Sequence, residues 1–312
     1  MANFSIRGYD HVKVGLKDIP SFEKALDAFG FQPITQPPPD YLKKPTSIWG
    51  SGEAFFCLYD ASHPLAKTSH AAHGDWIFDL SYWVEAGSPT FFEIDEGVEG
   101  LQHTLVSTRS FQPVAAKRGI IRFDHNTINV DRNKLNPSVD RYMKSFGFEK
   151  GQFFQIRGKQ TGLDSWVTRS KDLSVQMPFN EATDDKSQIQ EYINIHHGGG
   201  VQHLALCTKD IIKTIDDVRK LSDVRFLDLP DTYYEVIEKR LKIRESFSDL
   251  KRLRIQADQD ESGYLLQIFT QYLFGGFFFE LIQREGCQGF GEGNFQALFE
   301  AIELDQKRRG VL

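Results

Sequence analysis

Cysteine, excess positive charge and long apolar runs are all scarce in this sequence of 312 residues. The three cysteines, Cys57, Cys207 and Cys287, are odd in number and widely spaced. This argues against a disulfide scaffold and favours a reducing, cytoplasmic compartment. The 37 Lys and Arg residues are outnumbered by 43 Asp and Glu residues, so the net charge is −6. Nucleic acids and anionic membranes attract clustered positive charge, so we expect neither as a partner.

No apolar run in the sequence is long and continuous enough to predict a membrane span. The most apolar stretch, residues 264–282, contains Gln267 and Glu280 and is divided by Gly275 and Gly276. A spanning helix needs about 20 mostly apolar residues without such breaks. We therefore expect two buried strands joined by a turn. Charged residues near the N-terminus also argue against an export signal.

The overall composition is that of a globular chain with two domains. At about 150 residues per domain, a chain of this length corresponds to two domains. A hydrophobic content of 40% and a charged content of 26% exclude fibrous and disordered classes. The 26 phenylalanines are unusually many, and we expect most of them in the core.

The two halves of the chain resemble each other. Residues 8–31 and 122–148 each begin with a strand-like stretch containing Asp-His, continue through a helical pattern and end in Phe-Gly-Phe. Their starting points lie 114 positions apart. Self-similarity of this kind indicates two related domains, which we place at residues 1–114 and 115–312.

Each half contains a further repeat. Residues 201–220 form a strand pattern followed by a helix pattern, and residues 76–87 occupy the matching place in the first half. His203 in the second half corresponds to Asp79 in the first. We therefore predict an α+β protein built from four strand–helix–strand modules, two in each domain.

Capping residues predict where three of the helices begin. Asn136 and Asp210 are predicted to cap two helices of the second domain, and Asn294 to cap a last helix over residues 294–309. The predicted apolar faces of the first and last of these helices are Val139, Tyr142, Met143 and Phe146, and Phe295, Leu298, Phe299 and Ile302.

Three residues from separate strand-like runs form a candidate metal site. His125, His203 and Glu280 lie 78 and 77 positions apart, about one module each. Strand alternation puts His125 on a face with Phe123 and Thr127. It puts Glu280 on a face with Phe278, and Phe277 and Phe279 on the opposite face. A carboxylate in such surroundings is costly to bury without a partner. Two histidines and one carboxylate compose the facial triad of non-haem Fe(II) oxygenases, although zinc sites use the same ligands.

Plainer interpretations compete for each of these residues. A single histidine is more often a hydrogen-bonded core residue than a ligand, and Glu280 could pair with an arginine. The other histidines are weaker candidates, because His70 and His73 are predicted to lie in a loop without a third ligand. His11 matches the first ligand in the repeat, but Asp79 takes the place of the second. We therefore expect no complete metal site in the first domain.

The second domain resembles a known enzyme family. The run HHGGGVQHLALCTKDIIKTI closely resembles 4-hydroxyphenylpyruvate dioxygenases, and residues 122–130 resemble the strand with that family's first iron ligand. Further matching segments are residues 226–242, 263–270, 277–286 and 289–312. The first domain resembles the family only in its Asp-His strand and around Phe-Gly-Phe. The resemblance implies tandem βαβββ modules of the vicinal oxygen chelate, or glyoxalase-like, fold, with a C-terminal helix over the active site.

The resemblance also implies a reaction and a set of site residues. One Fe(II) per chain would be held by His125, His203 and Glu280. The substrates would be 4-hydroxyphenylpyruvate and O₂, and the products homogentisate and CO₂, as in tyrosine catabolism. A homo-oligomer is expected. The matching catalytic positions are Gln202, Gln267 and Phe295, and the matching substrate-binding positions are Ser165, Asn180, Gln188, Phe269, Phe290 and Asn294.

Three other functions remain open. Hydroxymandelate synthase uses the same triad and substrate but oxidises the benzylic carbon, and the bulky Phe269 favours the dioxygenase. The other two are a zinc or nickel isomerase or lyase and a non-catalytic binding or resistance protein of the same fold. The chain departs from the family between Thr270 and Glu280, where the turn is shorter and uncharged, and at Asn126 and Ile128. These departures would alter the pocket or the position of Glu280.

Overall fold

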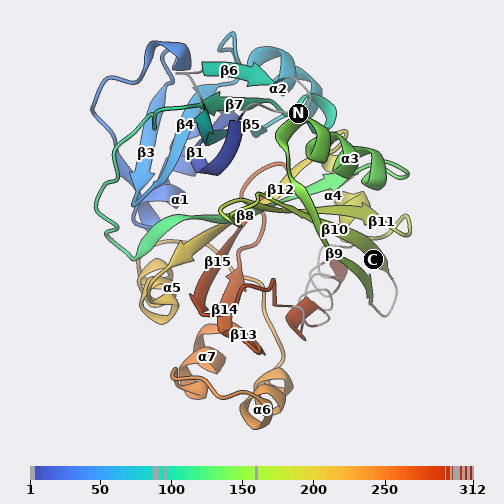
Figure 1. The fold of residues 1–312 in the computed structure, drawn as a ribbon. Coiled ribbons are helices and arrows are strands. Elements are labelled where there is room, and N and C mark those ends of the chain that lie inside the picture. Colours follow the sequence, from blue (N-terminus) through green and yellow to red (C-terminus); the bar gives the residue numbers. More distant parts are fainter. Residues whose placement is uncertain are drawn as a thin grey trace.

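Two curved sheets dominate the protein. The computed structural model describes residues 4–86, 91–94, 97–158 and 161–291, and beyond these the positions 293–295, 297, 303, 306, 307 and 310. In this part of the chain, the strands form one seven-stranded and one eight-stranded sheet. The first half of the chain supplies the upper sheet in Figure 1, and the second half supplies the lower one. This is the α+β organisation predicted from the sequence.

The seven-stranded sheet has the order β2-β3-β4-β1-β5-β7-β6. Strand β1 lies in the middle and pairs parallel with β4 and antiparallel with β5. The strands are β1 (Phe4–Leu16), β2 (Gln32–Pro33), β3 (Ser47–Ser51), β4 (Ala54–Asp60), β5 (Trp76–Ala86), β6 (Phe91–Ile94) and β7 (His103–Val106). The helices are α1 (Ile19–Ala28) and α2 (Lys67–His73), with 3₁₀ turns η1 (Asp40–Leu42) and η2 (Val98–Gly100). The series β1-α1-β2-β3-β4 is one βαβββ module.

The eight-stranded sheet has the order β13-β14-β15-β12-β8-β11-β10-β9. The strands are β8 (Ile120–Val130), β9 (Glu149–Arg157), β10 (Gly162–Arg169), β11 (Gln176–Ala182), β12 (Gly200–Thr208), β13 (Gln256–Asp260), β14 (Gly263–Phe269) and β15 (Phe278–Glu285). The helices are α3 (Leu135–Phe146), α4 (Gln188–His196), α5 (Ile211–Leu221), α6 (Asp231–Arg240) and α7 (Phe247–Leu253). The series β8-α3-β9-β10-β11 is a second βαβββ module. Helices α6 and α7 enlarge the last module between α5 and β13 (Figure 1).

Local capping explains where the helices begin, and it corrects one prediction. Asp210 caps α5 as predicted, because its carboxylate accepts a hydrogen bond from the backbone N–H of Lys213 at 2.9 Å. Asn136 does not cap α3, which begins one residue earlier at Leu135. The N–H of Leu135 instead donates to the carboxylate of Glu181 on β11, at 2.9 Å. A tertiary contact therefore replaces the local cap.

The predicted apolar face of α3 is correct except at Met143. Val139, Tyr142 and Phe146 are buried, whereas Met143 is 37% exposed. Position 143 follows a buried tyrosine directly, so on a helix it points to a different side.

Helix α2 contains two histidines that the sequence pattern predicted to lie in a loop. His70 and His73 lie in α2, so the predicted loop there is wrong. His70 pairs with Asp75 at 2.8 Å, and the His73 ring stacks on His196, at the end of α4, with centroids 4.6 Å apart. The stacking of His73 on His196 links the two halves of the chain. Both contacts give these histidines a structural explanation that needs no metal.

Strand β15 joins the two halves of the molecule. The Phe279 ring is fully buried against three rings of the first half, with centroids 5.9 Å from Phe22, 5.4 Å from Phe29 and 5.8 Å from Phe56. The apolar stretch 264–282 is therefore β14, a turn and β15, as predicted. No helix among the described residues is long and apolar enough to cross a membrane.

The connection between the sheets runs from the end of β7 to the start of β8. Within it, the N–H of Val114 donates to the carbonyl of Gly52 at 2.9 Å, which attaches this point of the chain to the first sheet. The predicted boundary between residues 114 and 115 lies in this connection and stays a prediction.

Candidate active site

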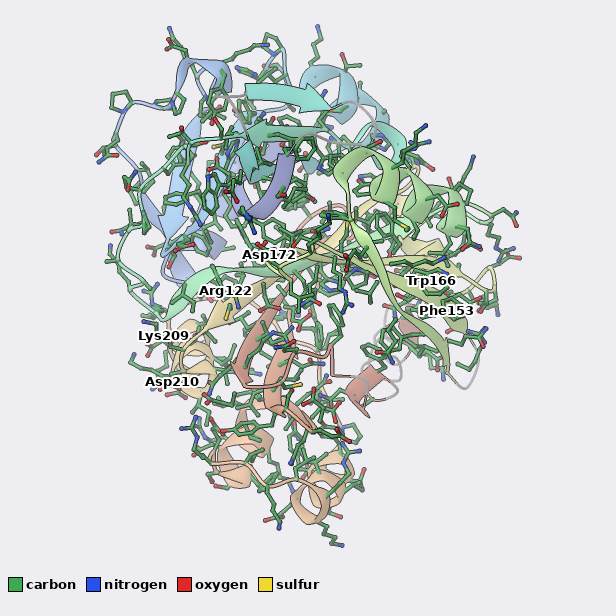
Figure 2. The ribbon with its side chains drawn as sticks, viewed as in Figure 1. Arg122, Phe153, Trp166, Asp172, Lys209 and Asp210 are labelled. Carbon is green, nitrogen blue, oxygen red and sulfur yellow. The ribbon has the colours of Figure 1, made fainter. Side chains whose placement is uncertain are left out.

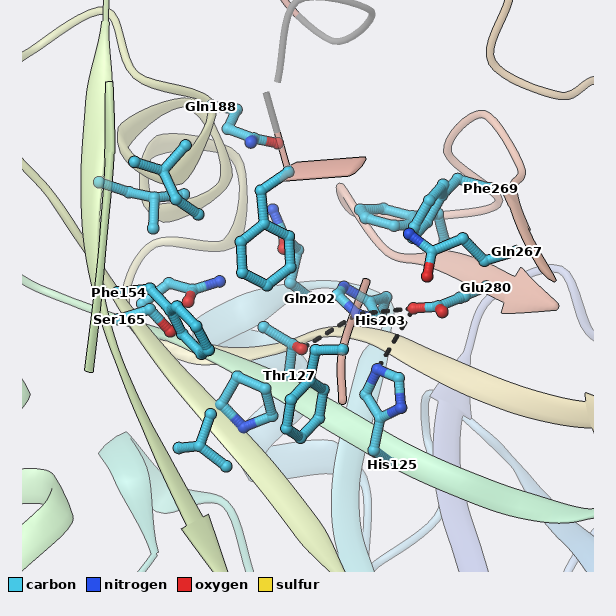
Figure 3. A pocket seen from close by; sticks show the side chains of 18 residues that line it. His125, Thr127, Phe154, Ser165, Gln188, Gln202, His203, Gln267, Phe269 and Glu280 are labelled. Carbon is cyan, nitrogen blue, oxygen red and sulfur yellow. Dashed lines mark hydrogen bonds and ion pairs between the residues drawn. The ribbon is translucent and has the colours of Figure 1, made fainter. Parts of the chain in front are cut away.

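Three neighbouring strands bring the predicted ligands together. His125 lies on β8, His203 on β12 and Glu280 on β15, and these strands are adjacent in the sheet. A carboxylate oxygen of Glu280 lies 3.2 Å from Nε2 of His125 and 3.6 Å from Nε2 of His203 (Figure 3). One ligand atom from each residue lies within 4.8 Å of the others. All three side chains are buried.

A bulge in β8 turns His125 into this position. Two residues of β8, Asp124 and His125, oppose the single residue Ala205 of β12. Such a bulge shifts the alternation of faces by one residue. Phe123 consequently faces the first domain, where its ring lies 5.2 Å from that of Phe56. The prediction that Phe123 shares a face with His125 is therefore wrong.

The predicted alternation holds along β15. Phe278 and Glu280 both line the pocket. Phe277 and Phe279 belong to the hydrophobic core on the opposite face, where their rings are 5.4 Å apart. The carboxylate of Glu280 therefore does not enter the phenylalanine core, because it lies on the pocket face and contacts the two histidines.

Charged groups around the triad set the protonation of the histidines. Burial alone would lower the pKa of His125, but the carboxylates of Glu280 and Asp124 raise it to about 9. Burial, assisted by the charge of His125, holds the pKa of His203 well below its usual range. A proton on His125 therefore supplies positive charge beside Glu280 in the metal-free protein. A bound metal would displace that proton.

The geometry and chemistry of the triad fit a divalent metal. Nδ1 of His125 is hydrogen-bonded to Asp124 at 3.0 Å, so Nε2 is directed toward Glu280. A histidine ligand commonly donates its other ring N–H to a carboxylate in this way. Two imidazole nitrogens and one carboxylate suit Fe(II) or zinc and leave coordination positions open. Across the described residues, this is the one group of three such side chains that could hold an ion.

The triad forms one end of a pocket that contains most of the predicted site residues. Eight predicted non-ligand positions line it, and they are Gln202, Gln267, Phe295, Ser165, Asn180, Gln188, Phe269 and Phe290. Figure 3 shows this pocket with the triad joined by dashed lines. Strands β8, β12 and β15 supply the end that holds the triad, which we call the metal end. Strands β10 and β11, where Ser165 pairs with Asn180, supply the other end.

Asn294 does not join the pocket. Its side chain is fully buried and accepts a hydrogen bond from the hydroxyl of Tyr233 at 2.6 Å. Gly293 before it already has helical geometry, so Asn294 is not the helix cap either. Both predictions for Asn294 are therefore corrected, since the residue anchors the start of the C-terminal helix to α6. Leu298, Phe299 and Ile302, predicted for the apolar face of that helix, lie outside the described residues.

The pocket also contains residues that were not predicted as site residues. Thr127 contacts Nε2 of His203 at 3.0 Å, and its strand position next but one to His125 could have identified it. The ring of Phe154 on β9 lies edge-on to Phe295, with centroids 5.0 Å apart. The remaining lining residues are Ile156, Leu163, Val167, Pro178 and Phe278. These apolar residues carry no signal that separates a pocket wall from a core.

Two glutamines in the pocket wall each have a buried polar atom without a partner in the described part of the structure. Among the described residues, neither Nε2 of Gln202 nor Oε1 of Gln267 has a hydrogen-bond partner. Buried polar atoms are nearly always paired. Both side chains line the pocket, so a polar ligand there could satisfy them.

Comparison with known proteins supports the resemblance noted in the sequence. No family model matches the chain. The chain is 45% identical over 341 aligned positions to a protein of Legionella pneumophila (strain Corby) named 4-hydroxyphenylpyruvate dioxygenase, an alignment covering 98% of this chain and 96% of that protein. The chain belongs to the 4-hydroxyphenylpyruvate dioxygenase family. A protein of the same name from Yarrowia lipolytica is 32% identical, covering 99% of this chain and 94% of that one.

Solved structures confirm the fold. A variant of 4-hydroxymandelate synthase from Streptomyces coelicolor superposes with a TM-score of 0.82 at 24% identity, covering 97% of this chain and 99% of that one. A fusion of a xylose isomerase-like TIM barrel with a 4-hydroxyphenylpyruvate dioxygenase gives a TM-score of 0.76 at 18% identity, covering 98% of this chain and 53% of that one. At these identities the likeness concerns the fold alone, and it confirms the paired modules of the vicinal oxygen chelate fold.

The first domain of this family member carries a different cluster at the matching place. In the first sheet, Lys13 on β1 lies opposite Asp79 on β5 in the strand register. In the second sheet, Thr127 on β8 lies opposite His203 on β12 in the same way. The ammonium of Lys13 lies 3.0 Å from the carboxylate of Asp79 and 2.8 Å from the hydroxyl of Thr104. Burial alone would raise the pKa of Asp79, but Lys13 holds it below its usual range. We call Lys13, Asp79 and Thr104 the lysine cluster.

Proposed function

We propose that this protein is an Fe(II)-dependent dioxygenase that converts 4-hydroxyphenylpyruvate and O₂ to homogentisate and CO₂, with one Fe(II) per chain. The observation that carries the proposal is the buried triad of His125, His203 and Glu280 at one end of an aromatic pocket. Membership of the 4-hydroxyphenylpyruvate dioxygenase family supplies the reaction.

The triad would hold the iron and leave positions open on its pocket side. When bound there, Fe(II) supplies coordination sites for the 2-oxo acid of the substrate and for O₂, and the electrons for O₂ activation. The substrate carries its own 2-oxo acid, so no second organic substrate is needed. The protein's part is to orient the substrate and to exclude water.

The arrangement of the pocket sets the direction of the substrate. Its 2-oxo acid end belongs at the metal end of the pocket, beside Gln202 and Gln267, whose buried atoms lack partners within the described structure. The phenol hydroxyl then points toward Ser165 and Asn180 on β10 and β11, where Gln188 also lines the wall. Substrate recognition is thus polar at both ends.

Aromatic side chains would hold the ring between these two ends. The pocket is lined by Phe269, Phe290 and Phe295. The Phe290 ring lies 5.2 Å from the His125 ring, and the Phe269 ring lies 6.3 Å from the His203 ring. Phe269 and Phe290 thus cover the end of the pocket that holds the triad, whereas Phe295 packs against Phe154 on β9. Together the three rings restrict how the substrate ring can turn. Gln202, Gln267 and Phe295 are the residues we assign to catalysis, as groups that contact or enclose the reacting end.

Product analysis tests this function. Metal-free protein is reloaded anaerobically with Fe(II), mixed with 4-hydroxyphenylpyruvate and exposed to air, and the products are separated by chromatography. Homogentisate and 4-hydroxymandelate are isomers, so retention time must accompany the mass. Homogentisate and CO₂ in equal amounts are expected. Release of 4-hydroxymandelate would identify a synthase instead, and no O₂ consumption would identify a binding protein. Protein loaded with zinc is the control.

The state of assembly stays a prediction. A homo-oligomer is expected from the family resemblance, and light scattering of the purified protein would measure it.

A further inference from the structure

Arg284 occupies an unusual position behind the candidate metal site. It lies on β15 four residues after Glu280, and only 13% of its side chain is exposed. Its Nε donates to both carboxylate oxygens of Asp124, at 3.1 and 3.0 Å, and its Nη2 donates to one of them at 2.7 Å. Burial alone would lower the pKa of Arg284, but Asp124 raises it. Its charge is therefore fixed.

The other arm of the same guanidinium binds a different part of the chain. Nη1 of Arg284 donates to the backbone carbonyls of Cys287 and Gly289, at 3.2 and 2.6 Å. These carbonyls belong to residues 286–291, which lead from β15 toward the C-terminal helix and which we call the exit segment. Phe290, which lines the pocket against His125, is part of it.

One side chain thus contacts both the support of a metal ligand and the segment that closes the pocket. Asp124 binds Nδ1 of His125 on one side and Arg284 on the other. We propose that Arg284 is a positioning residue that couples the orientation of the ligand His125 to the seating of the exit segment. Metal binding at the triad and placement of Phe290 over the pocket then favour each other. This inference rests on the proposed function only for the statement that the triad is a metal site.

The chemistry of the guanidinium explains why arginine is needed. Its planar fork makes several hydrogen bonds in fixed directions, whereas a lysine ammonium is a single point charge. Here the fork engages one carboxylate and two carbonyls simultaneously. A lysine at this position could keep the charge beside Asp124, but it could not hold both partners in the same geometry. Arg284→Lys therefore keeps the positive charge beside Asp124 but removes the link between Asp124 and the exit segment.

Arg122 provides a matched control on the same carboxylate. It lies on β8 (Figure 2) and donates to Asp124 at 3.2 Å. Unlike Arg284, it is 43% exposed. Its other hydrogen bond within the described structure goes to the carbonyl of Phe123, not to the exit segment. Arg122→Lys therefore changes an arginine beside Asp124 without touching the link to Phe290.

The test compares metal binding and local dynamics in wild type, Arg284→Lys, Asp124→Asn and Arg122→Lys. Co(II) is titrated against a competing chelator, and hydrogen exchange of peptides covering the exit segment is measured with and without Co(II). In wild type, Co(II) should slow exchange in the exit segment. In Arg284→Lys, Co(II) affinity should fall about 10- to 100-fold, the usual effect of losing the support of a ligand. The exchange response should disappear. Arg122→Lys should behave like wild type in both measurements.

Several outcomes would overturn the coupling. One is that Co(II) does not change hydrogen exchange in the exit segment of the wild-type protein. Another is that Arg284→Lys keeps the wild-type affinity for Co(II) and still shows slower exchange when Co(II) binds. If Arg284→Lys does not fold, Asp124→Asn cuts the same link from its other end, so a retained response there also overturns it. Neither measurement uses the organic substrate. Failure to form homogentisate would therefore refute the proposed function without affecting this inference, and an unresponsive exit segment in an active enzyme would do the reverse.

Discussion

His103 should make the stability of the protein depend on pH. It lies on β7, is fully buried and stacks on Tyr82, with centroids 5.4 Å apart. Because the carbonyl of Leu80 can only accept, Nδ1 carries the proton and donates to it at 3.0 Å. Nε2 then accepts from the hydroxyl of Tyr142 on α3, at 2.7 Å. A neutral histidine therefore links the first domain to the second.

The size of the effect follows from the pKa of His103. Burial lowers this pKa from 6.5 to about 4. The unfolded chain takes up the proton first as the pH falls, so the stabilisation is complete above pH 6.5 and is lost between that pH and about 4. Linkage then predicts a loss in the free energy of unfolding of about 2 kcal/mol at pH 5 and about 3 kcal/mol at pH 4.

Urea unfolding of the metal-free protein and of His103→Gln, at pH 7, 6 and 5, measures this loss. The variant should be less stable at pH 7, because it loses the buried hydrogen bonds of the imidazole. It should also lose less stability on acidification, so the gap between the two proteins should narrow by about 2 kcal/mol between pH 7 and 5. Taking the difference removes the contribution of His196, whose pKa burial also lowers to about 4. A gap that stays constant over this range would refute the assignment.

Three further predictions concern the triad, the lysine cluster and the C-terminal helix. Glu280→Gln should fold but bind little Fe(II) and form little homogentisate, as metal content and product analysis would show; activity close to wild type would remove Glu280 from the site. Lys13→Met should lower the free energy of unfolding by about 3–5 kcal/mol, because the buried carboxylate of Asp79 loses its cation; unchanged urea stability would contradict this. Deletion of residues 294–312 should leave a folded, metal-binding protein whose O₂ consumption and CO₂ release exceed homogentisate formation. Insoluble protein would instead indicate that the helix is part of the core. Equal amounts of O₂ consumed and homogentisate formed would show that the helix does not gate the pocket.

The candidate metal cluster could be predicted from the sequence because Glu280 breaks a local pattern and the two histidines recur at a regular spacing. Glu280 interrupts a run of phenylalanines and leucines, and a buried carboxylate requires a partner. His125 and His203 recur at the spacing of the modules. Strand alternation then predicted which residues face them, and it holds for Phe278 on β15.

The failed predictions concern features that depend on distant contacts. The bulge that reverses the face of Phe123 is defined by pairing with β12, about 80 residues further along the chain. Asn294 has the composition of a helix cap, but its burial against Tyr233 depends on where α6 lies. Similarly, Glu181 replaces the cap of α3 from another strand. None of these partners can be read from neighbouring residues.

The lysine cluster makes the two halves of the molecule unequal in their dependence on metal supply. Thr104 stands in the parallel register where the second domain has Glu280, and Lys13 places an ammonium beside it. In the first domain the positive charge beside Asp79 is the ammonium of Lys13, which is part of the chain. A chelator, which removes a bound metal ion, cannot remove it. Removing the metal that we propose for the triad would change the charge balance of the second sheet only. The first sheet would keep its ion pair, and Phe279 of β15 would keep its ring contacts with Phe22, Phe29 and Phe56.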